Sequence, residues 1–250
     1  MPSFVFHTPR FQNVAERLTA PTSAAKAKAF RFRGMALKAA IVLTLELGGV
    51  ALGWHWTLIS EVTGKPTEPP WYILTPLLML VAGLLVWARA KWARGLAVPT
   101  GYLTGLFIGS TARLLDPYWL GIPSVVVLVV TATFWVAAWG YALGGGGRPL
   151  ALLPSLAVVV VALGVVFGVC ALAAGTVDEP AFWVERHWSI YVAAPLAAAF
   201  AVFVSMMPAL QSAKVSTAPR RLEWYGAFGW SIAPVTCYQY LFGLLWSINV

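Results

Sequence analysis

The sequence predicts an all-α, polytopic integral membrane protein, a bundle of seven transmembrane helices, and two observations lead to this class. Of the 250 residues, 60% are hydrophobic and only 10% are charged, with a mean hydropathy of +0.77. A soluble domain carries about 25% charged and 45–50% apolar residues. The second observation is that the apolar residues fall in runs of about 20, which is the length that crosses a bilayer core. We therefore expect the chain to be embedded in lipid.

Seven apolar runs predict the spans, and short loops rich in Gly, Pro or charged residues separate them. The predicted spans are 36–57, 71–88, 95–112, 118–143, 150–174, 189–211 and 226–248. The alternative is six spans, with 95–112 re-entrant because Pro99, Thr100 and Gly101 interrupt it. We prefer seven, because the alternative would place Arg113 beside the basic loop that follows the second span.

The basic residues predict the orientation of these spans. With a cytoplasmic N-terminus, fourteen Lys and Arg lie inside and three, Lys65, Arg113 and Arg186, lie outside. This is the asymmetry of the positive-inside rule. Tryptophans also gather at the predicted ends of the spans, as interfacial rings do. We therefore expect the N-terminus inside and the C-terminus outside.

Residues 1–35 form a basic cytoplasmic tail that is separate from the predicted bundle of residues 36–250. Within the tail, Phe11, Val14, Ala15 and Leu18 recur at the spacing of one helix face,. A short amphipathic helix is the natural interpretation. We expect it to lie on the protein's own surface; the alternatives are a membrane interface or a partner protein.

Small residues predict where helices pack closely. Gly101, Gly105 and Gly109 form a stripe on the third predicted span, and in lipid such a stripe allows close approach of another backbone,. We expect contact within the chain rather than dimerisation, with the sixth or seventh span as the neighbour. The sixth span is rich in alanine and the seventh opens with Gly226, Gly229 and Ala233. These three helices are expected to form the centre of the bundle.

Glu46 is the one carboxylate in the middle of a predicted span. An ionised side chain at that depth costs about 2.5–3.5 kcal/mol on insertion scales. We therefore expect Glu46 to face the bundle, protonated and hydrogen-bonded to a neighbouring helix. The functional alternative is a polar path lined by Glu46, Thr104 and the cluster Tyr238, Gln239 and Tyr240.

No catalytic or metal-binding pattern stands out. His7, His55 and His187 have no second ligand or nucleophile at a recognisable spacing, and Cys170 and Cys237 lie in apolar runs,. We expect no catalytic residues, no cofactor and no metal. The positive net charge is explained by loops facing an anionic leaflet, so the expected partners are the lipid bilayer and other membrane subunits, with no nucleic acid.

Three segments resemble the Bax inhibitor-1/YccA-like membrane family, especially its bacterial branch. They are 218–229 (APRRLEWYGAFG), 101–109 (GYLTGLFIG) and the first span from Gly34 to Trp54 after a basic tail. The resemblance implies seven spans and a bacterial cytoplasmic (inner) membrane. It also implies acids associated with a cation or proton leak, but the matching positions here are Met206, Pro208, Tyr240 and Thr104.

Without those acids the implied leak loses its chemical basis, although the scaffold can remain. The expected function is therefore a non-enzymatic structural or accessory subunit of a membrane assembly. The alternative is a cation or proton leak channel, or a small-solute transporter, that uses Glu46 and the polar cluster of the last helix.

Overall fold

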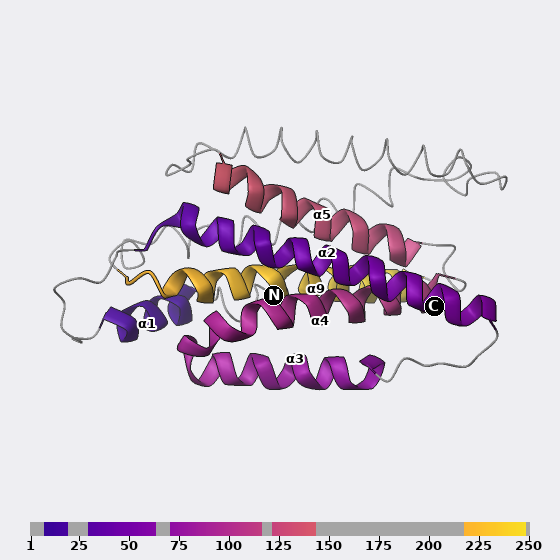
Figure 1. The fold of residues 1–250 in the computed structure, drawn as a ribbon, viewed down its shortest axis with the longest axis horizontal. Helices are drawn as coiled ribbons and strands as arrows, with labels where there is room; N and C mark the ends of the chain where they lie inside the picture. The colour runs from indigo at the N-terminus through magenta and orange to yellow at the C-terminus, as the bar shows by residue number, and fades with distance from the viewer. Residues whose placement is uncertain (1–7, 20–29, 64–70, 117–121, 144–217, 249–250) are drawn as a thin grey trace.

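The computed structural model describes residues 8–19, 30–63, 71–116, 122–143 and 218–248, and every regular element in these ranges is a helix (Figure 1). The elements are α1 (Thr8–Thr19), α2 (Phe32–Thr63), α3 (Trp71–Ala88), a 3-10 turn η1 (Ala90–Trp92), α4 (Ala93–Leu115), α5 (Ile122–Leu143) and α9 (Leu222–Ile248). Long apolar segments explain why the chain is helical here, and α3, α4 and α9 each accommodate one internal proline, Pro76, Pro99 and Pro234. An all-α fold is confirmed for these residues.

A helix occupies five of the seven predicted ranges, and the ranges 150–174 and 189–211 lie outside the described residues. α2 begins at Phe32, four residues before the predicted boundary between tail and bundle. Among the residues that the structure describes, two segments could cross a membrane by length and composition, namely Phe32–Thr57 and Pro123–Leu143, with mean hydropathies of 1.8 and 1.9. The number of spans is therefore still a prediction.

α4 is one continuous helix of 23 residues that contains Pro99. At 1.5 Å per residue it is about 34 Å long, which exceeds the hydrocarbon thickness of a bilayer, about 30 Å. An interrupted, re-entrant segment over 95–112 was the basis of the six-span alternative. The continuity of α4 removes that basis.

The described helices of the bundle alternate in direction. Lys38 near the start of α2 contacts Glu223 at the start of α9, and the Arg33 side chain donates a 2.7 Å hydrogen bond to the carbonyl of Ala142 at the end of α5. At the opposite end, the indole of Trp54 donates a 2.9 Å bond to the hydroxyl of Ser124 at the start of α5. α2 and α9 therefore run in one direction and α5 in the other (Figure 1).

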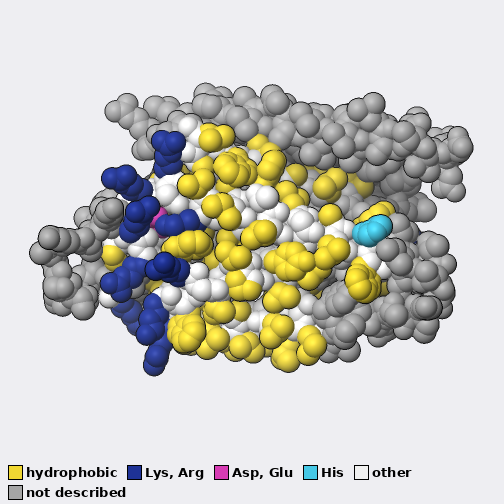
Figure 2. All heavy atoms as spheres, in the orientation of Figure 1, with side chains coloured by type: hydrophobic (Ala, Val, Ile, Leu, Met, Phe, Trp, Pro, Cys, Tyr) yellow, Lys and Arg dark blue, Asp and Glu magenta, His cyan; other side chains and the backbone are white. Residues whose placement is uncertain are grey.

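Charge and apolar surface are separated along the bundle (Figure 2). Lys and Arg side chains gather at one end, which we call the basic end, and an apolar band follows it. The cations of the basic end include Arg31, Arg33 and Lys38 at the start of α2, Arg89, Lys91 and Arg94 around η1, and Arg220 and Arg221 before α9.

The apolar band exposes large side chains on two helices. They include Leu37, Ile41, Leu45, Leu52 and Trp56 on α2 and Leu74, Leu77, Leu78, Leu80, Val81, Leu84, Leu85 and Trp87 on α3. Leu80 is 60% exposed. Soluble monomers rarely expose contiguous apolar surface of this kind, so the band is a contact surface for lipid or protein.

The tail helix α1 packs on the protein itself. Phe11 and Ala15 have no exposed surface, and the ring of Phe11 lies 5.9 Å from the ring of Tyr225 on α9. The predicted amphipathic helix is thus present, and its apolar face covers the bundle near the basic end. Its buried side chains are unavailable to a membrane or to a partner.

Candidate functional site: two buried carboxylates

The tightest contact in the described bundle joins α2 to α4. A β-carbon added at Gly101 would meet Val42, one at Gly105 would meet the backbone of Glu46, and one at Gly109 would meet the backbone of Val50. Each step of four residues along α4, from Gly101 to Gly105 to Gly109, corresponds to a step of four residues along α2, from Val42 to Glu46 to Val50. The two helices therefore run parallel and in register.

The contact is reciprocal. A β-carbon at Gly49 would lie 2.5 Å from the carbonyl oxygen of Tyr102, and one at Gly53 would strike the carbonyl of Leu106. The hydroxyl of Ser110 donates a 3.2 Å hydrogen bond to the carbonyl of Gly53. Backbone therefore meets backbone along both helices, which is the geometry that small residues permit in membranes.

This contact corrects one prediction. The stripe Gly101, Gly105 and Gly109 lies against a helix of the same chain as expected, but the helix that it meets is α2, the first predicted span, and not α9, the seventh. The reason is that α2 carries complementary glycines, Gly49 and Gly53, which let the two backbones interlock. The sixth span, 189–211, lies outside the described residues. Gly229 and Ala233 are buried on α9, which packs against α2, α4 and α5.

Glu46 lies inside the bundle beside this contact. Its side chain has no exposed surface, so it borders no space large enough for a water molecule. Neither carboxyl oxygen has a hydrogen-bond partner in the described part of the chain. The expected inward position is correct, but the expected hydrogen bond to a neighbouring helix is absent there. The hydroxyl of Thr104 on α4 is likewise buried and unpartnered.

The other residues of the predicted polar path do not converge on Glu46. Tyr238 is buried, whereas Gln239 is exposed and lines a groove on the outside of the bundle. The side chain of Tyr240 lies outside the described residues. Glu46 does not line that groove. Tyr238 and Gln239 are consecutive residues of α9 and point in different directions, so one is buried while the other faces the groove,. Gln239 therefore does not share a site with Glu46.

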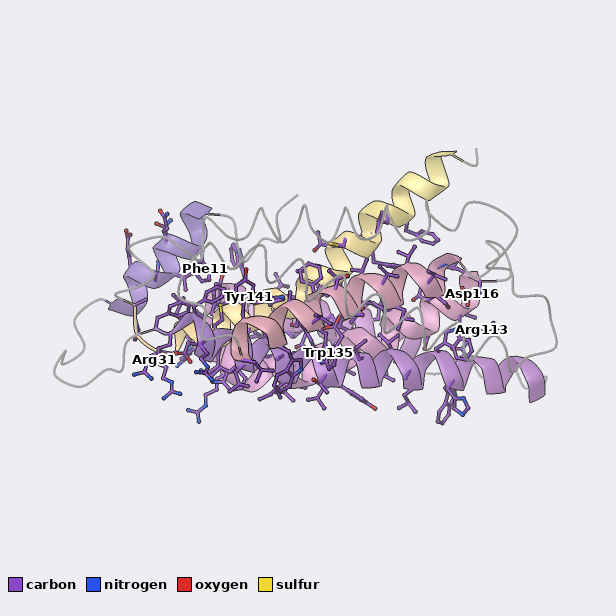
Figure 3. The ribbon with its side chains drawn as sticks, turned by 90° about the horizontal axis from the view of Figure 1, so that it is seen from above. Phe11, Arg31, Arg113, Asp116, Trp135 and Tyr141 are labelled. Carbon is purple, nitrogen blue, oxygen red and sulfur yellow. The ribbon has the colours of Figure 1, made fainter. Side chains whose placement is uncertain are left out.

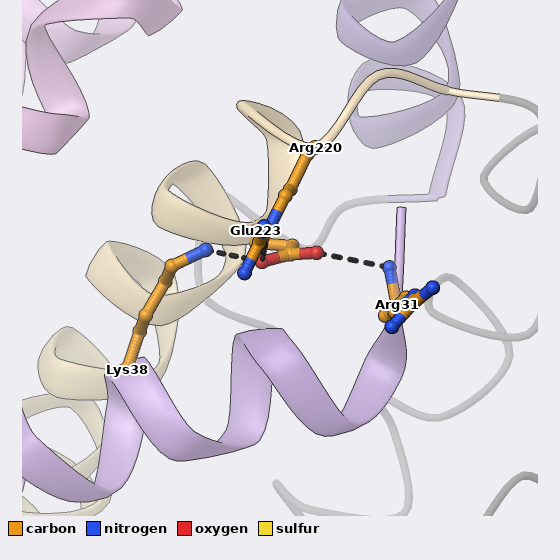
Figure 4. Close-up of polar contacts among 4 residues, drawn as sticks. All are labelled: Arg31, Lys38, Arg220 and Glu223. Carbon is orange, nitrogen blue, oxygen red and sulfur yellow. Dashed lines mark hydrogen bonds and ion pairs between the residues drawn. The ribbon is translucent and has the colours of Figure 1, made fainter. Parts of the chain in front are cut away.

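A second buried carboxylate, Glu223, organises the basic end (Figure 4). Its side chain has no exposed surface and forms an ion pair with the ammonium of Lys38. Arg220 Nε lies 3.5 Å from Oε2, and the backbone N–H of Arg31 donates a 3.1 Å hydrogen bond to Oε1. The acid therefore connects α9, α2 and the segment before α2.

Local sequence explains how Glu223 can be buried there. It lies in the first turn of α9, where the helix dipole favours negative charge,. Gly34 makes room for it, because a β-carbon at Gly34 would lie 2.6 Å from Oε2. Lys38 also lies 5.3 Å from the ring centre of Trp224. This cluster was not predicted from the sequence, although the acid Glu223 stands between a basic pair, Arg220 and Arg221, and an apolar helix, which is a usable signal.

The opposite end of the bundle has its own polar junction. Asp116, just after α4, accepts a 3.1 Å hydrogen bond from the backbone N–H of Ser124 and a bond from its hydroxyl. Arg113 lies 4.0 Å from Asp116 and 5.4 Å from the ring centre of Trp54 (Figure 3). Polar contacts between helices are therefore present at both ends of the described bundle.

Within the ranges that the structure describes, no group of three His, Cys, Asp or Glu could hold a metal ion. His55 is exposed and Cys237 is buried. Comparison with protein families, with characterised proteins and with solved structures finds no match to this chain.

Proposed function

We propose that this chain is a seven-span membrane protein of Bax inhibitor-like architecture that serves as a structural or accessory subunit of a membrane assembly. Its N-terminus lies in the cytoplasm, its C-terminus lies outside, and the membrane is the bacterial cytoplasmic membrane. It holds its partners by packing and performs no chemistry of its own.

The separation of charge and apolar surface supports the membrane location. The cations of the basic end lie on one side of an apolar band, and α2, α4 and α9 all leave that end in the same direction. Cytoplasmic loops carry the excess of Lys and Arg in membrane proteins. The three segments that carry the family resemblance also meet one another, since 101–109 packs on α2 and Glu223 binds Lys38.

One observation carries the structural role. Glu46, the only carboxylate in the middle of a predicted span, is sealed between helices whose backbones touch, and no water-sized space borders it. A transport path needs alternate access of such a group to water on both sides. A closed, small-residue interface instead provides a rigid body that can pack against other membrane proteins.

The experiment is to tag the full chain in its own membrane, extract it in mild detergent and measure the mass of the purified particle by light scattering. An accessory subunit is expected to elute in a particle larger than the monomer, containing a stoichiometric second protein. A monomer with no second protein would overturn the proposal.

Topology can be tested separately by cysteine labelling. Single cysteines at positions 17 and 250, in a chain with Cys170 and Cys237 replaced by Ala, should react from opposite sides of the membrane. Labelling of both positions from the same side contradicts seven spans.

The second candidate function is a proton leak through Glu46, and the unpartnered state of its two oxygens favours it. Polar groups kept in a membrane interior without partners are commonly functional. Reconstituted liposomes with a pH gradient give the test. A leak abolished by Glu46→Gln, in a variant that still folds, would establish this candidate over the structural role, whereas a wild type without flux excludes it.

A further inference from the structure

An open groove of about 470 Å³ lies on the outside of the bundle between α3 and α9, with α4 as its floor. Its lining is almost entirely apolar. The lining includes Pro76, Leu80, Gly83, Leu84 and Trp87 on α3, Phe107 on α4 and Val235 on α9. The volume lies within the range of small-molecule sites, about 300–1,000 Å³.

The groove is left open by a missing side chain. A β-carbon at Gly83 would meet no atom within 4 Å, so Gly83 leaves space unfilled on the face of α3 that borders the groove. Leu80, Leu84 and Trp87 around it are each about half-exposed. An apolar surface of this shape is complementary to a flexible hydrocarbon chain.

The dimensions indicate which hydrocarbon chain would fit. From Pro76 to Trp87 the rise along α3 is about 16 Å, close to half of the hydrocarbon thickness of a bilayer, about 30 Å. Trp87 is at the basic end, because α3 ends there and the chain continues into η1 and α4. The groove therefore spans the depth of one leaflet, starting from the basic end.

Charge complementarity indicates the headgroup. Arg89, Lys91 and Arg94 follow Trp87 within seven residues, and all three side chains are exposed. No acidic residue lies between Trp71 and Leu115, so no carboxylate of α3, η1 or α4 neutralises these cations. Basic residues at the cytoplasmic end of a groove between membrane helices are suited to an anionic headgroup.

We propose that this groove is a binding site for an anionic phospholipid of the cytoplasmic leaflet. One acyl chain lies between α3 and α9, and the phosphate contacts Arg89, Lys91 and Arg94. The inference rests on the proposed membrane location and is independent of whether the chain has a partner subunit.

The test uses native mass spectrometry of the purified full chain, titrated with phosphatidylglycerol or phosphatidylcholine in detergent. Wild type is expected to retain phosphatidylglycerol at least about tenfold more tightly than phosphatidylcholine. A β-carbon at Gly83 meets no atom within 4 Å, so Gly83→Leu should narrow the groove and weaken the binding of phosphatidylglycerol by about tenfold or more,. Gly48→Leu is the matched control, since Gly48 also meets nothing within 4 Å but lies on α2, away from the groove.

The headgroup is tested by a charge-matched pair. The triple variant R89Q/K91Q/R94Q should lose the preference for phosphatidylglycerol, whereas R17Q/R31Q/R221Q, which removes three exposed cations elsewhere, should retain it. Equal binding of the two lipids to wild type, equal effects of Gly83→Leu and Gly48→Leu, or equal effects of the two triple variants would each overturn the proposal. A melting temperature equal to that of the control variants shows that a variant is folded. Each lipid is added to the isolated chain, so the absence of a partner subunit would not change these outcomes.

Discussion

Glu46 and Glu223 are two carboxylates with no exposed surface, yet their surroundings are opposite. Glu223 receives an ion pair from Lys38, a contact from Arg220 and a backbone hydrogen bond from Arg31. Glu46 has no hydrogen-bond partner among the described residues. Burial alone therefore says little about the role of an acid in this protein.

The difference follows from position along the bundle. At the basic end, the starts of α2 and α9 meet, and cations and free backbone N–H groups are available because helix termini leave such groups unpaired. In the middle, each helix satisfies its own backbone and offers Glu46 no free N–H group, and no described side chain bonds to its carboxyl oxygens,. We infer that Glu223 stabilises the fold and that Glu46 is tolerated at a cost in stability.

The largest expected effect is at Glu223. Glu223→Leu leaves the ammonium of Lys38 without its partner and should lower the free energy of unfolding by about 3 kcal/mol, the lower end of the range for breaking a buried pair. The value is at the lower end because Arg220 is half-exposed and can be hydrated. Unfolding in mixed detergent and SDS micelles measures it. In the double variant K38M/E223L much of the loss should be recovered, and strictly additive losses would contradict the pairing.

The enclosure of Glu46 depends on Gly105. A β-carbon there would lie 2.8 Å from the carbonyl carbon of Glu46 and 2.9 Å from the nitrogen of Val50, and backbone atoms cannot move aside as a side chain can. Gly105→Leu should therefore destabilise the protein by about 1–3 kcal/mol. Gly48→Leu, with open space around it, should change stability by less than about 0.5 kcal/mol,. Equal effects of the two substitutions would show that α2 and α4 do not touch at Gly105.

Substitution of Glu46 should have the opposite sign to substitution of Glu223. Because no described hydrogen bond is lost, Glu46→Met removes a buried polar group and should raise the free energy of unfolding by about 1 kcal/mol. Glu46→Gln keeps a polar group in the same place and should give no such gain. A destabilised Glu46→Met in the same micelle assay would reveal a partner for this carboxyl group.

The smallest effect is expected at the exposed edge of the Glu223 cluster. Arg220 is 54% exposed, so Arg220→Gln should lower stability by about 0.2–1 kcal/mol, and the difference should shrink at high salt,. Arg221→Gln removes a neighbouring exposed cation with no described contact to Glu223 and serves as the control. A loss at Arg220 as large as that at Glu223 would show that Arg220, and not Lys38, is the principal partner.

Periodicity and composition were sufficient to predict several features of this protein. Long apolar runs fold as helices wherever they lie, because the backbone must satisfy its own hydrogen bonds in an apolar environment. The helices at 71–88, 95–112 and 226–248 were predicted on this ground, and so was the amphipathic helix around Phe11. Glycines four residues apart also identified a close contact, since only small residues allow backbones to touch.

Partner choice could not be predicted in the same way. By its own sequence, the glycine stripe of α4 could face any helix. It faces α2 because Gly49 and Gly53 of α2 allow the two backbones to touch, and these glycines lie more than 50 residues away in the sequence. The cluster around Glu223 forms only because folding brings Gly34 and Lys38 to it across about 185 residues.

The sequence by itself determined that the described chain is helical, which face of α1 is apolar, where two glycine-rich backbones could meet and that Glu46 would lie inside. Each of these depends on interactions within one helix or on the transfer of one side chain out of water. The tertiary structure alone decided that α4 pairs with α2, that Glu223 is neutralised while Glu46 is not, and that a groove opens beside Gly83. These depend on which helices become neighbours, and neighbours are chosen by the fit of whole surfaces rather than by any local pattern.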